Sequence, residues 1–142
     1  MKKIVLLIPL LLILSIVSYA QKTLTTPSGL KITITKEGKG DKPKKGAKVY
    51  VNYIGTLASN GVEFDNSEGY PIDFILGTGQ VIKGWDESIA MLRKGSKATL
   101  YVPAKLGYGE KGYPMSEGEG VSIPPNTDLI FEVELKKFKP SK

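Results

Sequence analysis

Strict alternation of apolar and polar residues near the C-terminus is the sequence feature that most constrains the fold of this chain. Every second position there is apolar: Leu129, Phe131, Val133 and Leu135. Glu132, Glu134 and Lys136 lie between them or directly after. Successive side chains of a β-strand point to opposite faces, so this segment predicts a strand with one buried and one solvated face. A one-sided strand is typical of an antiparallel sheet that is covered on one face only.

Other segments of the chain have the same strand character. Asn60-Gly61 is a hairpin turn signal between two of them. β-Branched, aromatic or alternating residues predict five further strands: residues 30–35, 49–57, a returning strand that begins at 62–64, 72–76 and 97–102.

One segment has helical spacing. Its apolar stripe consists of Trp85, Ile89 and Leu92. Acidic residues 86–87 suit the first turn, basic residues 93–94 suit the last, and Gly95 is placed to end the helix. Several antiparallel strands with one short helix predict an α+β domain in which the helix covers one sheet face.

Two absences exclude whole classes of chemistry. The 142 residues include no Cys and no His. Disulfides, thiol nucleophiles, cysteine zinc sites and histidine-centred triads are therefore excluded. A metal site made of carboxylates alone would need clustered acidic residues, and the sequence has no such spacing. We expect neither a metal nor a cofactor.

The first twenty residues have the pattern of a secretory signal peptide. Lys2 and Lys3 precede an apolar run at residues 4–17, and Ser18 and Ala20 are small residues before Gln21. The alternative is a membrane anchor, but 14 apolar residues fall short of the roughly 20 that a span needs. We expect cleavage after Ala20 and an exported protein, periplasmic or secreted, of 122 residues without a stable membrane anchor.

Two motifs suggest ligands that the context does not support. Residues 107–112 match G-x-G-x-x-G, but Pro114 would interrupt the helix that a dinucleotide site requires. Residues 36–48 hold six lysines without aromatic residues for stacking, which favours a solvated loop. The net charge of +6 falls to +4 without Lys2 and Lys3, so we expect no nucleic-acid partner.

Five blocks in order resemble the FKBP-type peptidyl-prolyl isomerase family, from about residue 30 to residue 138. The blocks are residues 45–55, GVEFDNS at 61–67, FILG with QVIKGWD between 74 and 86, residues 95–109, and IPPNT at 123–127 with the strand 129–135. The resemblance implies a bent antiparallel sheet wrapped around one short helix. It also implies a layout of signal peptide (1–20), N-terminal extension (21–29) and isomerase domain (30–139).

The resemblance also implies a hydrophobic substrate pocket. Trp85 would form its floor, Asp65 and Tyr108 its polar rim, and the Ile82 N–H would bind a substrate carbonyl. The candidate catalytic residues are Asp65, Tyr108 and Ile82. The implied substrate-binding residues are Tyr53, Phe64, Asp65, Val81, Ile82, Trp85, Tyr108, Ile123 and Phe131. The implied partners are proline-containing polypeptides, with macrolide inhibitors as further candidate ligands, and we expect a monomer.

The chain departs from the best-known family members near this pocket. Ile72 stands after Pro71 where they have an aromatic residue, the preceding loop is shorter, and Tyr113 replaces a frequent His. Residues 115–120 are additional, and residues 116–120 are polar and glycine-rich. They predict either a mobile flap over the pocket that tunes substrates or an inert surface loop. These changes bear on substrate preference and inhibitor affinity.

Isomerisation of a prolyl bond needs no nucleophile, metal or cofactor, which suits a chain without His or Cys. The main hypothesis is an isomerase that assists the folding of exported proteins. The alternatives are a non-catalytic binding module or holdase with the same fold, and a basic protein that contacts anionic polymers through residues 36–48. Taken singly, Trp85 or Phe131 would be assigned to a core, but the set in family order favours a site.

Overall fold

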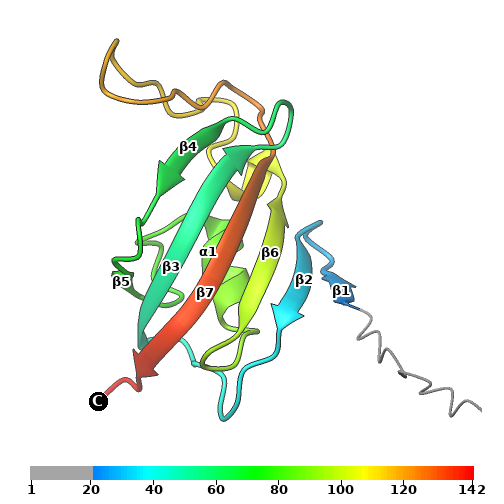
Figure 1. Cartoon of the computed structure of the whole chain (residues 1–142), viewed down its shortest axis with the longest axis vertical. Coiled ribbons are helices and arrows are strands. Elements are labelled where there is room, and N and C mark those ends of the chain that lie inside the picture. The colour runs from blue at the N-terminus through cyan, green and yellow to red at the C-terminus, as the bar shows by residue number, and fades with distance from the viewer. Residues whose placement is uncertain (1–20) are drawn as a thin grey trace, which may run out of the picture.

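The computed structural model describes residues 21–142, so the predicted signal peptide lies outside the described residues (Figure 1). One α-helix, one short 3-10 helix and seven strands follow in chain order. They are β1 (Lys22–Thr25), β2 (Lys31–Lys36), β3 (Lys48–Leu57), β4 (Glu63–Asn66), β5 (Ile72–Ile75), α1 (Lys83–Ile89), β6 (Lys97–Val102), η1 (Ala104–Leu106) and β7 (Leu129–Lys139).

The strands form one antiparallel sheet in the order β1-β2-β6-β7-β3-β4. The two longest strands, β3 and β7, pair along their length in the middle, and β5 takes the first half of the free edge of β3 while β4 takes the second. Figure 1 shows α1 on one face of this sheet. The antiparallel α+β prediction is confirmed.

The alternation that predicts β7 corresponds to its burial. Leu129, Phe131, Val133 and Leu135 are at most 3% exposed. They join a core with the inward residues of β2, β3 and β6 and with Trp85 and Ile89 of α1. The helix approaches the sheet closely because Gly84 has no side chain: a Cβ there would lie 2.6 Å from Cγ1 of Val102. The core therefore fills the space between α1 and the sheet.

The helix is shorter than its apolar stripe predicts, and its expected end at Gly95 is wrong. It ends at Ile89, because Met91 and Leu92 donate to the carbonyls three residues back, Ser88 and Ile89, at 3.0 and 3.2 Å. Such bonds tighten the last turn and terminate an α-helix. Leu92 is nevertheless fully buried, so the apolar stripe predicts correctly which side chains enter the core.

The sequence also gives no signal for β1. All four of its residues are exposed, so they lack the alternation of a half-buried strand. They pair with β2 at the sheet edge, in register from Lys22 opposite Ile34 to Thr25 opposite Lys31. A turn at residues 27–29 follows. Within residues 21–142 no helix is long and apolar enough to cross a membrane.

Candidate functional site

A small cavity opens between α1 and the sheet. Eight of the nine substrate-binding residues named from the sequence line it: Tyr53, Phe64, Asp65, Val81, Ile82, Trp85, Tyr108 and Phe131. Its volume is about 160 Å³. A cavity of about 150 Å³ holds a benzene ring, so this one has room for a five-membered ring.

Four aromatic rings build the wall and floor of this cavity. The Trp85 ring meets Tyr53 at 4.9 Å and Phe131 at 5.3 Å between centroids, both edge to face. Phe64 stands edge to face against Phe131 at 5.6 Å. The rings come from β3, β4, α1 and β7, so only the folded chain assembles them. Edge-to-face rings lock one another's orientation, which makes the cavity preformed.

Gly55 of β3 allows the rings to approach. A Cβ at this position would lie 2.7 Å from Cζ of Phe64 and 2.9 Å from Cε1 of Phe131. Real Cβ atoms do not tolerate such distances, so a larger residue would push both rings toward the cavity. The glycine within the strand therefore shapes the site.

The polar rim is organised around Asp65. The Tyr53 hydroxyl donates to Oδ2 of Asp65 at 2.6 Å, and the Asn66 N–H donates to Oδ1 at 2.8 Å. Burial and then the Asp65 hydrogen bond and charge raise the pKa of Tyr53. Burial, the Asp65 charge and Tyr113 raise the pKa of Tyr108. Both phenols therefore stay protonated at neutral pH and remain hydrogen-bond donors.

The segment that carries Ile82 is held from two sides. The Asp86 carboxylate of α1 accepts the Gly77 N–H at 2.8 Å and the Gly79 N–H at 2.9 Å. The side-chain oxygen Oε1 of Gln80 accepts the Ile75 N–H at 2.9 Å. In the described part of the chain, the Ile82 N–H donates to no protein acceptor. A fixed backbone donor beside an apolar cavity is suited to bind a carbonyl oxygen.

Ile123 is the one residue of the predicted set that does not line the cavity. It is 4% exposed and packs in the core. Its backbone exchanges two hydrogen bonds with Tyr113, at 2.8 and 2.9 Å, which close the base of the loop 113–123. Ile72 and Gln80 line the cavity, although the predicted set omits them. Ile72 could have been included from the sequence, because the family members that the chain resembles have an aromatic residue at that position.

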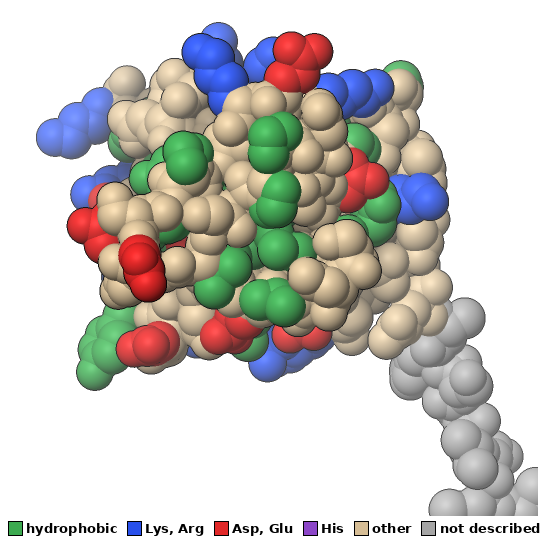
Figure 2. All heavy atoms as spheres, turned by 90° about the horizontal axis from the view of Figure 1, so that it is seen from above, with side chains coloured by type: hydrophobic (Ala, Val, Ile, Leu, Met, Phe, Trp, Pro, Cys, Tyr) green, Lys and Arg blue, Asp and Glu red, His purple; other side chains and the backbone are tan. Residues whose placement is uncertain are grey.

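The surface around the cavity end of the molecule is partly apolar. Figure 2 looks onto this end, where apolar side chains run through the middle of the face and acidic side chains gather in its lower half. Val62 in the β3–β4 turn and Tyr113 and Val121 in the loop 113–123 are exposed apolar residues of this end. An extended polypeptide would find apolar contacts here beyond the cavity itself.

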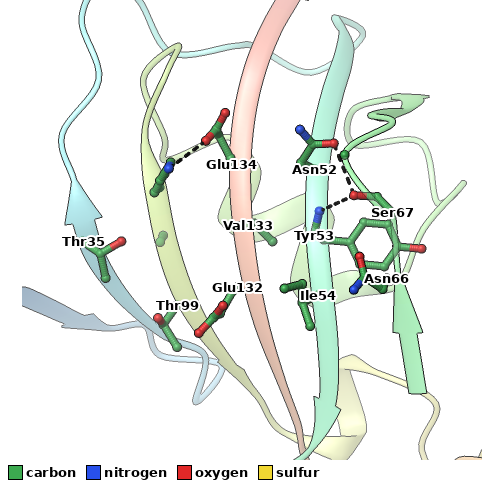
Figure 3. A pocket seen from close by; sticks show the side chains of 13 residues that line it. Thr35, Asn52, Tyr53, Ile54, Asn66, Ser67, Thr99, Glu132, Val133 and Glu134 are labelled. Carbon is green, nitrogen blue, oxygen red and sulfur yellow. Dashed lines mark hydrogen bonds and ion pairs between the residues drawn. The ribbon is translucent and has the colours of Figure 1, made fainter. Parts of the chain in front are cut away.

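A larger hollow, about 420 Å³, lies on the opposite face of the sheet (Figure 3). Some of its polar groups already have partners: Glu134 pairs with Lys97 at 3.3 Å, and the Ser67 hydroxyl, 3.2 Å from Oδ1 of Asn52, accepts the Tyr53 N–H. No aromatic cage faces it. The smaller cavity is therefore the candidate site despite its volume, because of these two hollows it is the one on which several aromatic rings converge.

Comparison with known proteins gives consistent matches. The family model described as FKBP-type peptidyl-prolyl cis-trans isomerase matches residues 39–136. FK506-binding protein 1 of Dictyostelium discoideum is 49% identical over 113 residues, which cover 78% of this chain and 99% of that protein. FKBP-type peptidyl-prolyl cis-trans isomerase FkpA of Escherichia coli (strain K12) is 43% identical over 119 residues, and the match spans 40% of its length.

Solved structures agree with these sequence matches. The crystal structure of AtFKBP13 superposes with a TM-score of 0.74 at 35% identity, covering 83% of this chain and 99% of that one. The crystal structure of FkpA from Escherichia coli superposes with a TM-score of 0.72 at 41% identity, covering 84% of this chain and 53% of that one. The family match over most of the domain, the identity and the shared fold show that this chain belongs to the FKBP-type peptidyl-prolyl cis-trans isomerase family.

Proposed function

We propose that this isomerase accelerates rotation about X–Pro bonds by seating the prolyl ring in the aromatic cavity. The observation that carries the proposal is the convergence of four aromatic rings and a polar rim on a space of about 160 Å³. Its dimensions suit one prolyl ring or a ring of similar size. The activity named for relatives that match most of the chain supports the same reaction.

The mechanism follows from the physics of the amide. Rotation passes through a twisted amide against a barrier of about 18–20 kcal/mol. Twisting removes the resonance that makes the planar amide polar, so an apolar wall disfavours the planar state relative to the twisted one. Donors at Tyr108 and the Ile82 N–H would hold the substrate carbonyl in the twisted geometry. Lowering the barrier by about 5.5 kcal/mol gives roughly 10⁴-fold acceleration.

The proposed role of Asp65 is orientation. Its carboxylate fixes the Tyr53 hydroxyl at 2.6 Å and so holds one side of the rim. Amide rotation moves no proton, so no general base is required. Macrolides that mimic a prolyl amide are the inhibitors we propose for this cavity, in line with relatives named as FK506-binding proteins.

A peptide isomerisation assay tests the proposal. The wild type should accelerate cis/trans exchange of an X–Pro model peptide, and FK506 should compete. Phe64→Ala, which opens the half-buried cavity wall, should lower kcat/KM by at least tenfold with the fold retained by circular dichroism. If the folded wild type does not accelerate the exchange, the remaining hypothesis is a holdase. The exposed apolar residues near the cavity favour that hypothesis. An assay for suppression of protein aggregation measures holdase activity directly.

We further propose that the protein acts outside the cytoplasm. The charged start, the apolar run at residues 4–17 and the small residues before Gln21 support export with cleavage after Ala20. N-terminal sequencing of the protein from cell fractions tests this. A protein that begins at Gln21 outside the cytoplasm is the expected result, and one that still begins near Met1 would contradict cleavage.

A further inference from the structure

Basic side chains gather at the end of the molecule away from the cavity. They belong to three segments, residues 36–48, 93–94 and 137–142, which together we call the basic end. Arg93 donates to the Gly40 carbonyl, the Lys39 N–H donates to the Lys94 carbonyl at 3.0 Å, and Lys48 pairs with Lys139 in the sheet register. The three segments are therefore neighbours in the fold.

The charge of the described residues is divided between two regions. The basic end holds eleven Lys and Arg and two carboxylates, Glu37 and Asp41, and we count with it the neighbouring Asp73 because its carboxylate pairs with Lys48. The remainder of residues 21–142 holds seven basic and eleven acidic residues. All basic side chains of the basic end except the half-buried Lys48 are exposed. A net excess of eight positive charges therefore lies on one side of the domain, although the net charge of residues 21–142 as a whole is small.

The position of this end in the fold leaves the site free. Figure 1 places the loop 36–48 and the C-terminus at the end opposite β4 and the loop 113–123. Lys22 borders a hollow of about 250 Å³ together with Lys42 and Arg93. Lys22, near the start of the described residues, therefore lies beside the basic end.

The composition of the basic end suits a charged surface better than a nucleic acid. Ten of its eleven cations are lysines, which act as point charges without the planar fork that arginine uses on phosphates and bases. It offers no free aromatic face for stacking, because the ammonium groups of Lys48 and Lys137 lie 5.7 and 4.7 Å from the centre of the Tyr50 ring. A cluster of exposed lysines on one side of a protein is attracted electrostatically to the headgroups of anionic lipids.

We propose that the basic end docks the protein on the surface of an anionic lipid bilayer, with the cavity facing away from the membrane. The attraction is electrostatic and long-range, so it needs no ordered lipid site and weakens with salt. The opposite charge of the two regions would orient the molecule as it approaches.

Vesicle binding tests this proposal independently of isomerase activity. The purified protein, its N-terminus determined, is sedimented with phosphatidylcholine vesicles and with vesicles that contain a quarter phosphatidylglycerol. Binding should require the anionic lipid and disappear at about 0.5 M salt. The triple variant Lys39→Glu, Lys42→Glu, Lys44→Glu should bind on the order of a hundredfold more weakly. Its activity on a soluble X–Pro peptide should be unchanged, since these residues are far from the cavity.

The matched control reverses three exposed lysines outside the basic end: Lys83→Glu, Lys105→Glu and Lys111→Glu. It has the same net charge as the test variant and should keep vesicle binding within a fewfold of the wild type. If both variants lose vesicle binding equally, net charge and not the basic end determines binding, which would overturn the proposal. Binding to neutral vesicles alone, or tighter binding to a DNA duplex than to anionic vesicles at equal salt, would overturn it as well.

Discussion

Two phenylalanine rings of the cavity wall lie close to the backbone of β3 because residue 55 has no side chain. Tyr53, two residues earlier on the same strand, sends its hydroxyl to Asp65 across the β3–β4 pair. One strand thus supplies both the space for the rings and the hydrogen bond of the rim. Substitutions at these positions separate packing from polar effects.

Gly55→Ala should damage the site more than the fold. The added Cβ would displace Phe64 and Phe131 at a cost of about 1–3 kcal/mol in unfolding free energy. We expect kcat/KM to fall by at least tenfold in an X–Pro peptide assay, since the cavity narrows. Gly38→Ala is the control, because its Cβ would collide with the Lys94 carbonyl at the other end of the molecule. Similar loss of activity in both variants would show that instability alone is responsible.

Asp65→Asn should keep substantial activity, and Asp65→Leu should lose more. An amide oxygen can still accept the Tyr53 hydroxyl, whereas leucine leaves that donor unpaired, a difference of about 1–2 kcal/mol. The assay should therefore show kcat/KM roughly tenfold lower for Asp65→Leu than for Asp65→Asn. Complete inactivity of a folded Asp65→Asn protein would contradict an orienting role.

At the scale of elements, the cavity depends on loops as well as on the sheet. Asp86 of α1 holds the segment that carries Val81 and Ile82, and two backbone bonds between Tyr113 and Ile123 close the loop 113–123. Tyr108 meets Tyr113 at 5.3 Å between ring centres, so the base of that loop contacts the cavity rim. Residues 115–120 do not line the cavity. Their influence on substrates would therefore come from charge or motion rather than from direct packing.

Shortening residues 115–120 to one glycine tests this influence. Glu117 and Glu119 are exposed at the cavity end, so the wild type should favour peptides with Lys or Arg beside the proline. Exposed charges in salt contribute well under about 1 kcal/mol, so the preference should be less than fivefold and should vanish in the shortened variant. Comparing kcat/KM for basic and acidic X–Pro peptides measures it. An unchanged preference would identify the loop as inert.

At the scale of the whole molecule, local sequence patterns predicted the central strands of the sheet but not its edge strand β1 or the C-terminal end of α1. Alternation located β3, β6 and β7 because their inward residues enter one core. It could not reveal β1, whose residues are all exposed, or the end of α1, which depends on the turn into β6. The cavity residues were found through the family motifs, since spacing alone does not distinguish Trp85 in a core from Trp85 in a site. Ile123 belongs to one of these motifs, but the structure places it in the core and not among the residues that line the cavity.

The response of the whole protein to pH follows from its titratable groups. Without His, no side chain of ordinary pKa changes charge between about pH 6 and 8, so stability and activity should be nearly flat there. Folding raises the pKa of three phenols, those of Tyr53, Tyr101 and Tyr108. Above about pH 10 the unfolded chain loses these protons while the folded chain keeps them. The unfolded state then binds fewer protons, so stability falls as the pH rises.

Urea unfolding from pH 7 to pH 11 measures this dependence. The wild type should keep a constant unfolding free energy to about pH 9 and lose stability above about pH 10. Tyr53→Phe should lose stability less steeply in the alkaline range, because burial and Asp65 raise the pKa of the Tyr53 phenol in the folded state. Tyr70→Phe is the matched control, since Tyr70 is 80% exposed. If the two variants lose stability with the same slope above pH 10, the half-buried phenol of Tyr53 at the cavity rim is not the source of the alkaline sensitivity.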